Sequence, residues 1–435
     1  MKEYNILIFP CGTEIANEII NALINHKYFK VLLASSEGNS YCNFRNQKID
    51  TLPFVTDDTF KDKLDSLIKI RDIDFIIPAH DDVAFILSKI ENDILALVIG
   101  QSKNINDIVR FKDITYEYFD GILPLAHMYK NLPRIEKFPL FTKPKKGQGS
   151  QNSIRLNNEE EYSSFFSTNI RKDFVLMECL TGEEFTIDCF SNNGDILYSG
   201  ARTREKTTRG ISVQSTLIRD HKLNTQFSKY AKIISESLNM NGVWFYQMKL
   251  DKNNVLKLLE VGPRVSGTMM LNRARGINFV ELALYQKLGY NVEVVYNDID
   301  ISLARSLVPV YKHNINYTSL YIDFDDTLLI DEKYINPNLM SLIFQVKNEN
   351  KTVTLITKNK KNNLTKILHK FGITNLFDDI IHITDKDKKI NFMVENSLLI
   401  DDSFNERKEV IQRGMYAYGI DNIDVLIKKG SQCKK

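Results

Sequence analysis

Three carboxylates stand directly after an apolar segment in the last third of the chain. The segment SLYIDFDDTLL (319–329) predicts a short buried strand that runs into Asp323, Asp325 and Asp326. Acids at the end of a buried strand are costly unless a cation compensates their charge. Asp323 is placed to attack phosphorus as a nucleophile, and Asp325, which points the same way, is placed to protonate a leaving group.

Later segments are expected to bring further groups to these acids. VTLIT ends at Thr357, Lys388 and Lys389 open a predicted helix, and SLLIDD ends at Asp401 and Asp402. Because the carboxyl ends of parallel strands meet at one crevice, we expect a site of three or four carboxylates, a hydroxyl and a lysine. Oxygen ligands of this kind suit Mg2+. The candidate ligands are Asp323, Asp325, Asp401 and Asp402.

A glycine-rich loop follows another predicted strand. In FPLFTKPKKGQGSQNS (138–153), Gly147, Gly149 and Ser150 leave backbone N–H groups free to bind phosphate oxygens. Lys143, at the end of the strand, would place a point charge on a polyphosphate. The segment has no GxxxxGK[ST] motif, so it is not a P-loop. A lysine-rich surface hairpin is the alternative interpretation.

Two segments after the loop carry charges in a regular order. In DFVLMECLTGEEFTID (173–188), acids follow an apolar strand, whose edge suits a purine while a carboxylate just beyond suits ribose hydroxyls. In GARTREKTTRGIS (200–212), Arg202 and Arg204 alternate and so point from one face of a strand, with Lys206 and Arg209 in the loop that follows. Such arginines suit a phosphate or a carboxylate, and ordinary charged hairpins are the alternative.

The segment WFYQMKLDKNNVLKLLEVGPRVSGT (244–268) predicts two strands around a polar turn. Gln247 and Glu260 fall near matching heights of that hairpin. Oxygen ligands on adjacent strands, beside a phosphate-binding loop, suit Mg2+. A polar pair on a plain hairpin is the alternative.

These groups need elements to position them, and the order of the apolar segments predicts several domains. In residues 1–106, short apolar strands alternate with amphipathic helices, which is typical of a parallel α/β domain. Residues 107–300 predict a mixed α+β domain. Residues 301–318 are interpreted as a connector, and residues 319–435 as a second parallel α/β domain.

Composition excludes some classes of function. The net charge of +2 over 435 residues gives no sign of a nucleic-acid partner. The five cysteines form no CxxC pair, and no Cys/His cluster suggests zinc. The apolar run at the N-terminus is too short for a signal peptide, and no stretch approaches the length of a membrane span. We therefore expect a cytoplasmic protein without a membrane partner.

The four blocks around Lys143, Glu184, Arg202 and the Gln247/Glu260 hairpin closely resemble the ATP-grasp superfamily, particularly carbamoyl-phosphate synthase and biotin carboxylase. The resemblance covers roughly residues 1–300. It implies a pre-ATP-grasp domain, then an ATP-grasp fold that binds ATP and one or two Mg2+ ions. By this resemblance Lys143 contacts the ATP phosphates, with Lys112 as a second lysine, and the loop of Gly147, Gly149 and Ser150 covers them. Glu178 and Leu180 would flank the adenine, and Glu184 would hold the ribose. Gln247 and Glu260 would bind Mg2+, while Arg264, Arg202 and Arg204 would face the acyl phosphate.

One position departs from the family pattern. The family usually has Asn two residues after the metal-binding Glu, in an E-x-N-P-R block, whereas this chain has Gly262 in EVGPR. One metal ligand is therefore missing, and a second Mg2+ would be bound more weakly or hydrated differently. An inactive module is the alternative, against which Lys143, Gln247, Glu260 and Arg264 argue.

Residues 319–430 resemble the HAD superfamily, with its four motifs in order, and IDDSFNER is most similar to the small subfamily that includes FkbH-type proteins. The resemblance implies a Rossmann-like phosphatase with one Mg2+. The catalytic residues would be Asp323, Asp325, Thr357, Lys388 and Lys389. The segments between the motifs leave no room for a cap domain, so we expect an open site.

Together these resemblances predict a bifunctional enzyme. The first part would join a small carboxylate to an amine through an acyl phosphate, and the second would dephosphorylate the amine partner or the product. A uronate, including a nucleotide-sugar uronate, an amino acid and a phosphorylated amine are the candidate substrates. The alternatives are an amino-acid or dipeptide ligase with an accessory HAD domain, and a nucleotide-sensing scaffold. The sequence names neither substrate nor the oligomeric state.

Overall fold

The computed structural model describes residues 2–36, 48–129, 138–147, 149, 152–167, 172–208, 210–306, 309, 311, 313–359 and 363–428. These residues form two compact units. Unit 1 contains the described residues up to 306, and unit 2 contains those from Pro309 on.

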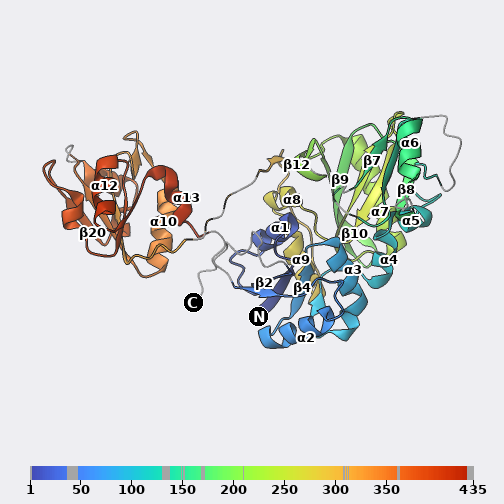
Figure 1. Ribbon diagram of the computed structural model, residues 1–435, viewed down its shortest axis with the longest axis horizontal. Helices are drawn as coiled ribbons and strands as arrows, with labels where there is room; N and C mark the ends of the chain where they lie inside the picture. Colours follow the sequence, from blue (N-terminus) through green and yellow to red (C-terminus); the bar gives the residue numbers. More distant parts are fainter. Residues whose placement is uncertain are drawn as a thin grey trace. The chain divides into compact units, whose positions relative to one another are not determined.

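The first elements of unit 1 form a parallel sheet of order β3-β2-β1-β4-β5, as the alternation of apolar strands and helices predicted (Figure 1). The strands are apolar on both faces because helices cover both: α1 and α9 pack on one face, and α2 and α3 on the other. Thr13 begins α1 by accepting a hydrogen bond from Ala16 N. The bounds are β1 Tyr4–Phe9, α1 Glu14–Ala22, β2 Phe29–Ser35, β3 Ile49–Thr51, α2 Phe60–Arg71, β4 Phe75–Pro78, α3 Asp81–Ile90, β5 Leu97–Val98 and α9 Phe279–Lys287.

The predicted boundary between residues 106 and 107 falls inside a helix, α4 (Lys103–Val109). The core of the first sheet also includes Phe190 and Phe245, which belong to the sheet that follows. The first two predicted domains therefore share one core and form a single compact unit, which is a correction of the boundary drawn from sequence.

A four-stranded antiparallel sheet of order β10-β9-β13-β14 is the centre of unit 1. Its buried face packs against α7, α4 and the residues that follow α5. The only tryptophan of the chain, Trp244, lies in this core and donates to Ser191 Oγ at 2.8 Å. The bounds are α5 Lys112–Tyr118, β9 Glu184–Asn192, β10 Asp195–Thr203, α7 His221–Leu238, β13 Gly242–Leu250, β14 Leu256–Gly262 and α8 Met270–Ala274.

Two three-stranded sheets complete unit 1, with the orders β7-β6-β8 and β11-β12-β15. In the second, β15 pairs antiparallel with β12. The predicted connector at 301–318 therefore begins inside unit 1, and its first residues were wrongly assigned. Three residues were too short a run for the sequence pattern to reveal a strand. The bounds are β6 Leu140–Pro144, β7 Ile154–Leu156, α6 Glu159–Phe166, β8 Phe174–Glu178, β11 Lys206–Thr208, β12 Ile211–Thr216 and β15 Ser302–Ala304.

Unit 2 is built on a parallel sheet of order β20-β19-β16-β21-β22. One face packs against α10, α11 and α13, and the other against α12 and a short 3-10 helix, η5. Between β16 and β19 the structure places only the β17–β18 hairpin and α10. The bounds are β16 Ser319–Ile322, β17 Leu329–Ile330, β18 Tyr334–Ile335, α10 Pro337–Asn348, β19 Thr352–Thr357, α11 Leu364–Lys370, β20 Asp379–His382, η5 Lys389–Phe392, β21 Ser397–Ile400, α12 Phe404–Gln412, β22 Tyr416–Tyr418 and α13 Ile423–Leu426.

Candidate active sites

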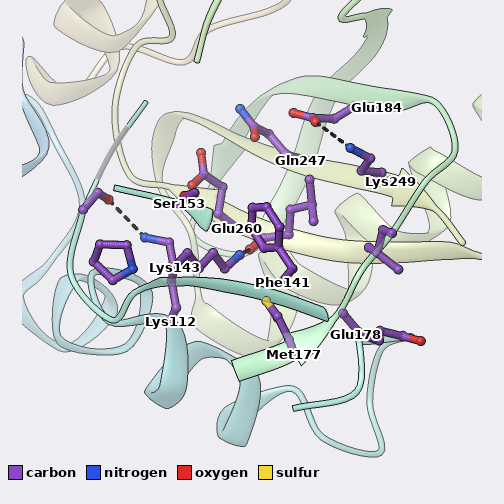
Figure 2. Close-up of a pocket in the computed structure, with 15 residues that line it drawn as sticks. Lys112, Phe141, Lys143, Ser153, Met177, Glu178, Glu184, Gln247, Lys249 and Glu260 are labelled. Carbon is purple, nitrogen blue, oxygen red and sulfur yellow. Dashed lines mark hydrogen bonds and ion pairs between the residues drawn. The ribbon is translucent and has the colours of Figure 1, made fainter. Parts of the chain in front are cut away.

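A first cavity in unit 1 is lined by the β6–β8 sheet and by the hairpin of β13 and β14 (Figure 2). Ala126, Phe141 and Met177 give it an apolar wall, which suits a purine ring. Eight residues for which the sequence predicted a contact with ATP or Mg2+ also line it. They are Lys112, Lys143, Gly147, Glu178, Leu180, Glu184, Gln247 and Glu260.

Two lysines in this wall have no carboxylate partner among the described residues. Lys143 Nζ donates to Leu259 O at 3.3 Å, and Lys112 Nζ donates to Gly147 O at 3.1 Å. Burial and the neighbouring Lys112 lower the pKa of Lys143 to about 8, and burial also lowers the pKa of Lys112. Cations without a counter-ion favour the entry of an anion, and a contact of these two lysines with phosphate stays a prediction.

Two carboxylates predicted for the nucleoside lie in the same wall. Glu178 Oε1 accepts a hydrogen bond from His127 N at 3.0 Å, so one of its oxygens is already engaged. Glu184 forms ion pairs with Arg204 at 2.6 Å and with Lys249 at 3.6 Å. The two cations hold the Glu184 carboxylate in place at the wall, where a ribose hydroxyl would meet it.

The two predicted magnesium ligands stand opposite each other. The antiparallel register pairs Gln247 on β13 with Glu260 on β14, next to a bulge in the ladder. Neither side chain has a hydrogen bond or an ion pair with another described residue. Oxygen donors that are held by a sheet and lack protein partners fit a hard cation such as Mg2+.

A second cavity, of about 240 Å³, shares Gln247 and Glu260 with the first. Its wall brings together four arginines from different parts of unit 1, which are Arg202, Arg204, Arg264 and Arg305. Gly149 of the glycine-rich loop also lines it. Ser150 and Arg209, two further residues of the sequence hypothesis, lie outside the described residues.

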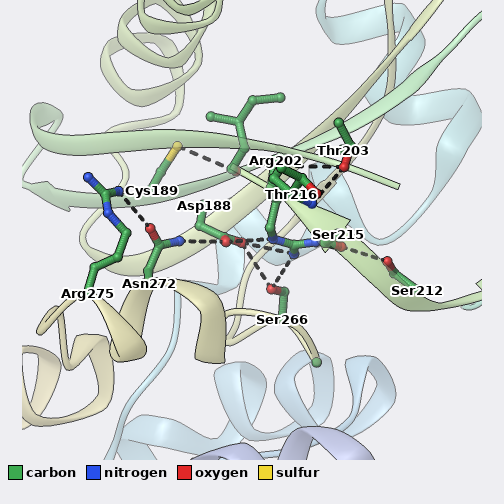
Figure 3. Close-up of polar contacts among 12 residues, drawn as sticks. Asp188, Cys189, Arg202, Thr203, Ser212, Ser215, Thr216, Ser266, Asn272 and Arg275 are labelled. Carbon is green, nitrogen blue, oxygen red and sulfur yellow. Dashed lines mark hydrogen bonds and ion pairs between the residues drawn. The ribbon is translucent and has the colours of Figure 1, made fainter. Parts of the chain in front are cut away.

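Arg202 belongs to a buried polar network (Figure 3). Its Nε donates to Asp188 Oδ2 at 2.9 Å and its Nη2 donates to Ser266 Oγ at 3.0 Å, while Nη1 has no partner among the described residues. Asp188 also accepts from Ser266 at 3.0 Å and from Asn272 at 2.9 Å. Sequence reasoning placed Arg202 at the acyl phosphate without seeing this internal counter-ion.

Arg204 and Arg264 are also paired. Arg204 forms its ion pair with Glu184, and Arg264 forms one with Asp81 at the beginning of α3. No local signal marks Asp81 as a partner, because it is far from Arg264 along the chain. Arg305 and Glu14, two further residues of the second cavity, were missed for the same reason.

The structure gives a physical reason for Gly262. A Cβ atom at this position would lie 2.2 Å from Cε1 and Cζ of Phe245. The Phe245 ring therefore occupies the space that a side chain would need, and it also stacks under the Arg264 guanidinium at 5.4 Å. The absence of a side chain at position 262 is thus coupled to an aromatic residue on the neighbouring strand.

In unit 2, the ends of β16 and β21 bring Asp323, Asp401 and Asp402 together, with oxygens within 4.8 Å of one another. Lys389 Nζ donates to Asp323 and, at 2.7 Å, to Asp401 Oδ2. Burial raises the pKa of Asp323 to about 7 and raises that of Asp401, because water is excluded from both. Two buried acids, Asp323 and Asp401, together with the exposed Asp402, offer oxygen ligands of the kind that fit a divalent cation.

Asp325, Thr357 and Lys388, the other predicted residues of unit 2, form contacts outside the group of Asp323, Asp401 and Asp402. Asp325 accepts two hydrogen bonds of 3.0 Å from Asn359 Nδ2, and Thr357 Oγ1 accepts one of 3.0 Å from Asn359 N. Asp325 is not part of the three-acid group. Lys388 forms an ion pair with Glu409 at 2.6 Å and is exposed, so only Lys389 reaches the acids.

Two residues were missed at this site. Asn359 holds Asp325, and the Thr327 hydroxyl accepts from Asp402 N at 3.0 Å. Both follow a predicted strand by a few residues, so the rule that polar groups gather at strand ends could have found them.

Comparison with known proteins identifies one of these regions. A sequence family described as "ATP-grasp in the biosynthetic pathway with Ter operon" matches residues 171–305. Unit 1 therefore contains an ATP-grasp domain. None of the curated proteins gives a significant match.

Solved structures share the fold at low sequence identity. Biotin carboxylase from Campylobacter jejuni superposes with a TM-score of 0.54 at 15% identity, over 67% of this chain and 72% of that chain. L-amino acid ligase from Bacillus licheniformis superposes with a TM-score of 0.53 at 18% identity, over 66% of this chain and 75% of that chain. N5-carboxyaminoimidazole synthetase from Staphylococcus aureus, complexed with ADP, superposes with a TM-score of 0.54 at 16% identity, over 68% of this chain and 80% of that chain.

None of the helices that the structure describes combines the length and apolar character that a bilayer crossing requires.

Proposed function

We propose that unit 1 is an ATP-dependent carboxylate–amine ligase. The observation that carries this proposal is the joint placement of Lys143, Gln247 and Glu260 in one cavity, with no protein counter-ion for the lysine among the described residues. A substrate carboxylate oxygen would attack the γ-phosphorus of ATP, and ADP would leave. The amine nitrogen would then attack the acyl carbon, a C–N bond would form, and phosphate would leave.

The residues of the first cavity would divide this work. Lys143 and Lys112 would neutralise the phosphates, because phosphoryl transfer depends mainly on positioning and on charge stabilisation. Gln247 and Glu260 would hold Mg2+, which when bound neutralises charge on the transferred phosphoryl group. Glu184 would bind the ribose, and the apolar wall would receive the adenine with Glu178 and Leu180 at its edge. The shared wall formed by Gln247 and Glu260 would connect ATP to the second cavity.

ADP release against a panel of carboxylates and amines, with phosphorylated amines and uronates included, tests the ligase. Lys143→Ala and Glu260→Ala should each abolish ADP formation without changing the fold of unit 2. ADP formation at the wild-type rate in either variant would show that the substituted residue does not belong to the ATP site. If the wild-type protein binds MgATP but releases no ADP with any pair, the alternative of a nucleotide-sensing scaffold takes its place.

We propose in addition that unit 2 is a Mg2+-dependent phosphatase of the HAD type. Its support is the cluster of Asp323, Asp401, Asp402 and Lys389 at the strand ends of a parallel sheet, together with the motif resemblance. Asp323 would attack phosphorus and form an aspartyl phosphate while the alcohol leaves with a proton from Asp325. Water would then release phosphate. No inserted domain covers the strand ends within the described residues, which suits a larger substrate.

Fusion of the two activities would raise the concentration of one product at the second site. The phosphatase substrate would then be a phosphorylated form of the amine or of the ligated product. Asp323→Asn should abolish Mg2+-dependent hydrolysis of p-nitrophenyl phosphate and leave ADP formation unchanged, and mass spectrometry should find a phosphorylated product that accumulates. If the product carries no phosphate with any amine, unit 2 is an accessory domain. If the wild-type protein hydrolyses no phosphomonoester, the phosphatase proposal is wrong.

A further inference from the structure

The chain that leaves the end of β19 is held by contacts to neighbouring elements. Thr357 Oγ1 accepts a hydrogen bond of 3.0 Å from Asn359 N, which tightens the turn after the strand. Lys358 Nζ forms an ion pair of 2.5 Å with Glu406 on α12. The carbonyl oxygen of Asn359 accepts a hydrogen bond from Nε2 of His382, at the end of β20. The backbone around Asn359 is therefore supported by α12 and by β20.

The side-chain amide of Asn359 contacts the carboxylate of Asp325. Its Nδ2 atom donates to Asp325 Oδ1 and to Asp325 Oδ2, each at 3.0 Å. Asn359 is only 4% exposed, so water competes little for its amide. Rotation of the carboxylate would weaken at least one of the two hydrogen bonds, and the amide therefore restricts the direction in which Asp325 points.

The phosphatase reaction proposed for unit 2 depends on this direction. When an oxygen of Asp323 attacks phosphorus, the bond between phosphorus and the alcohol oxygen breaks, and the alcohol oxygen takes the bonding electrons. That oxygen leaves as a neutral alcohol if Asp325 delivers a proton to it while the bond breaks. The transfer requires the carboxyl group and the leaving oxygen to lie within hydrogen-bond reach, so an acid that rotates freely is less effective.

We propose that Asn359 is a positioning residue, which directs the carboxyl group of Asp325 toward the leaving oxygen of the phosphatase substrate. The inference rests on the proposed phosphatase function of unit 2. Asn359 acts through Asp325, since it supplies neither the nucleophile nor the proton. Its backbone N–H, which holds Thr357, is present whatever the side chain, so Asn359→Ala releases Asp325 without removing the contact to Thr357.

A series of aryl phosphates tests the proposal, because these esters have similar sizes and differ in how much the leaving group needs a proton. p-Nitrophenolate leaves readily as an anion, whereas phenolate and p-methylphenolate depend more on protonation. In full-length Asn359→Ala, assayed with Mg2+, kcat/KM for phenyl and p-methylphenyl phosphate should fall by roughly tenfold to hundredfold. The value for p-nitrophenyl phosphate should change little. Asn338→Ala, at an exposed asparagine of α10, is the matched control and should leave all three values unchanged.

The pattern of the losses separates this inference from the phosphatase proposal. An equal loss for all three esters would mean that the substitution disturbs the whole site, and it would overturn the inference while the phosphatase stands. Wild-type values for all three esters in Asn359→Ala would overturn it as well. If the wild-type protein hydrolyses none of the esters, the phosphatase proposal fails and the inference fails with it.

A double variant shows whether Asn359 acts through Asp325. Asp325→Asn removes the proton donor and should produce the same selective loss to a larger extent. Asn359→Ala added to Asp325→Asn should then cause little further loss, because the group that it positions is already absent. Losses that multiply in the double variant would mean that the two residues act independently, and the inference would be wrong.

His382 provides a second variant, which leaves the amide of Asn359 intact. His382→Ala removes the hydrogen bond to the carbonyl oxygen of Asn359 and should produce a smaller loss that is again confined to phenyl and p-methylphenyl phosphate. His369→Ala, at an exposed histidine of α11, is the matched control and should have no effect. An unchanged rate with p-nitrophenyl phosphate shows that the variant is folded. A loss shared equally by the three esters in His382→Ala would contradict the support of Asp325 through Asn359.

Discussion

Arg202 Nε donates a hydrogen bond of 2.9 Å to Asp188 Oδ2, and the two residues are only 1% and 0% exposed. Removal of one partner from such a pair leaves an uncompensated charge in the interior. Asp188→Ala should therefore destabilise unit 1 by about 3–5 kcal/mol. The loss should exceed that of an ordinary buried hydrogen bond, because Asp188 also accepts from Ser266 and Asn272.

Trp244 makes this measurement specific to unit 1. It is the only tryptophan of the chain and lies in the core that Asp188 borders, so urea unfolding followed by its fluorescence reports on unit 1 alone. Glu236→Ala breaks an exposed ion pair with Lys232 and should cost well under about 1 kcal/mol. If Asp188→Ala lowers the free energy of unfolding by no more than Glu236→Ala does, Asp188 does not compensate the buried charge of Arg202.

The pKa of Lys143 predicts how ATP binding depends on pH. Burial and Lys112 lower this pKa to about 8, so the free protein loses the Lys143 proton as the pH rises through 8. ATP phosphates favour the protonated form, and binding must then take up a proton. The Kd for ATP should rise above pH 8, with a slope that approaches about tenfold per pH unit.

Lys143→Arg is the control for that profile. A guanidinium keeps its proton throughout this range, so the part of the slope that Lys143 contributes should disappear between about pH 7.5 and 9.5, even where the affinity at neutral pH is lower. Calorimetry in two buffers of different ionisation enthalpy would measure proton uptake directly. The same slope in wild-type protein and variant would exclude Lys143 from the phosphate contacts.

The parts of the fold and of the site that could be predicted are those set by residues close together in the sequence. Lys143 ends a strand, and Gln247 and Glu260 face each other across a short hairpin, so sequence neighbours alone fix their positions. Four strands of the parallel sheet, β1, β2, β4 and β5, were predictable because their apolar runs are continuous, whereas the edge strand β3 (Ile49–Thr51) is too short and too polar to give such a run. Nothing local marks an ion pair between residues far apart in the chain, such as Arg264 and Asp81.

Short elements and distant segments account for the remaining differences. The three residues of β15 carry no recognisable periodicity, yet their pairing with β12 directs Arg305 into the second cavity. Glu14 enters the same cavity from the first helix. A charge pattern read along the chain finds Arg202 and Arg204, but it does not show that each already has an internal partner.

Glu184 should control the affinity for ATP. It lines the first cavity and is held by Arg204 and Lys249, so Glu184→Ala would remove the proposed ribose contact and free two cations. The apparent KM for ATP should rise by about tenfold, with a smaller effect on kcat. Steady-state ADP release at saturating second substrates measures both constants. Glu183→Ala, an exposed neighbour, is the matched control, and equal KM values in the two variants would remove Glu184 from the nucleotide site.

Gly262 and Phe245 should be energetically coupled. A Cβ atom at 262 would lie 2.2 Å from two atoms of the Phe245 ring, so Gly262→Asn forces this ring or its strand to move. The substitution should destabilise unit 1 by about 1–3 kcal/mol and should not improve Mg2+ affinity, although Asn is the residue that the ATP-grasp pattern leads one to expect. Gly100→Ala is the control, because its Cβ would meet only ordinary contacts at 3.9 Å.

The double variant decides whether the Phe245 ring is the cause. Phe245→Ala alone opens a cavity and should cost about 3–5 kcal/mol, but it also removes the group with which the introduced asparagine side chain would clash. Phe245→Ala combined with Gly262→Asn should therefore be more stable than the sum of the two single losses by about 0.5–3 kcal/mol. Urea unfolding monitored at Trp244 gives all three values, and a Mg2+ titration of ADP formation shows whether the added amide then binds the metal. Additive losses, or tighter Mg2+ binding in Gly262→Asn alone, would mean that the ring does not exclude the usual ligand.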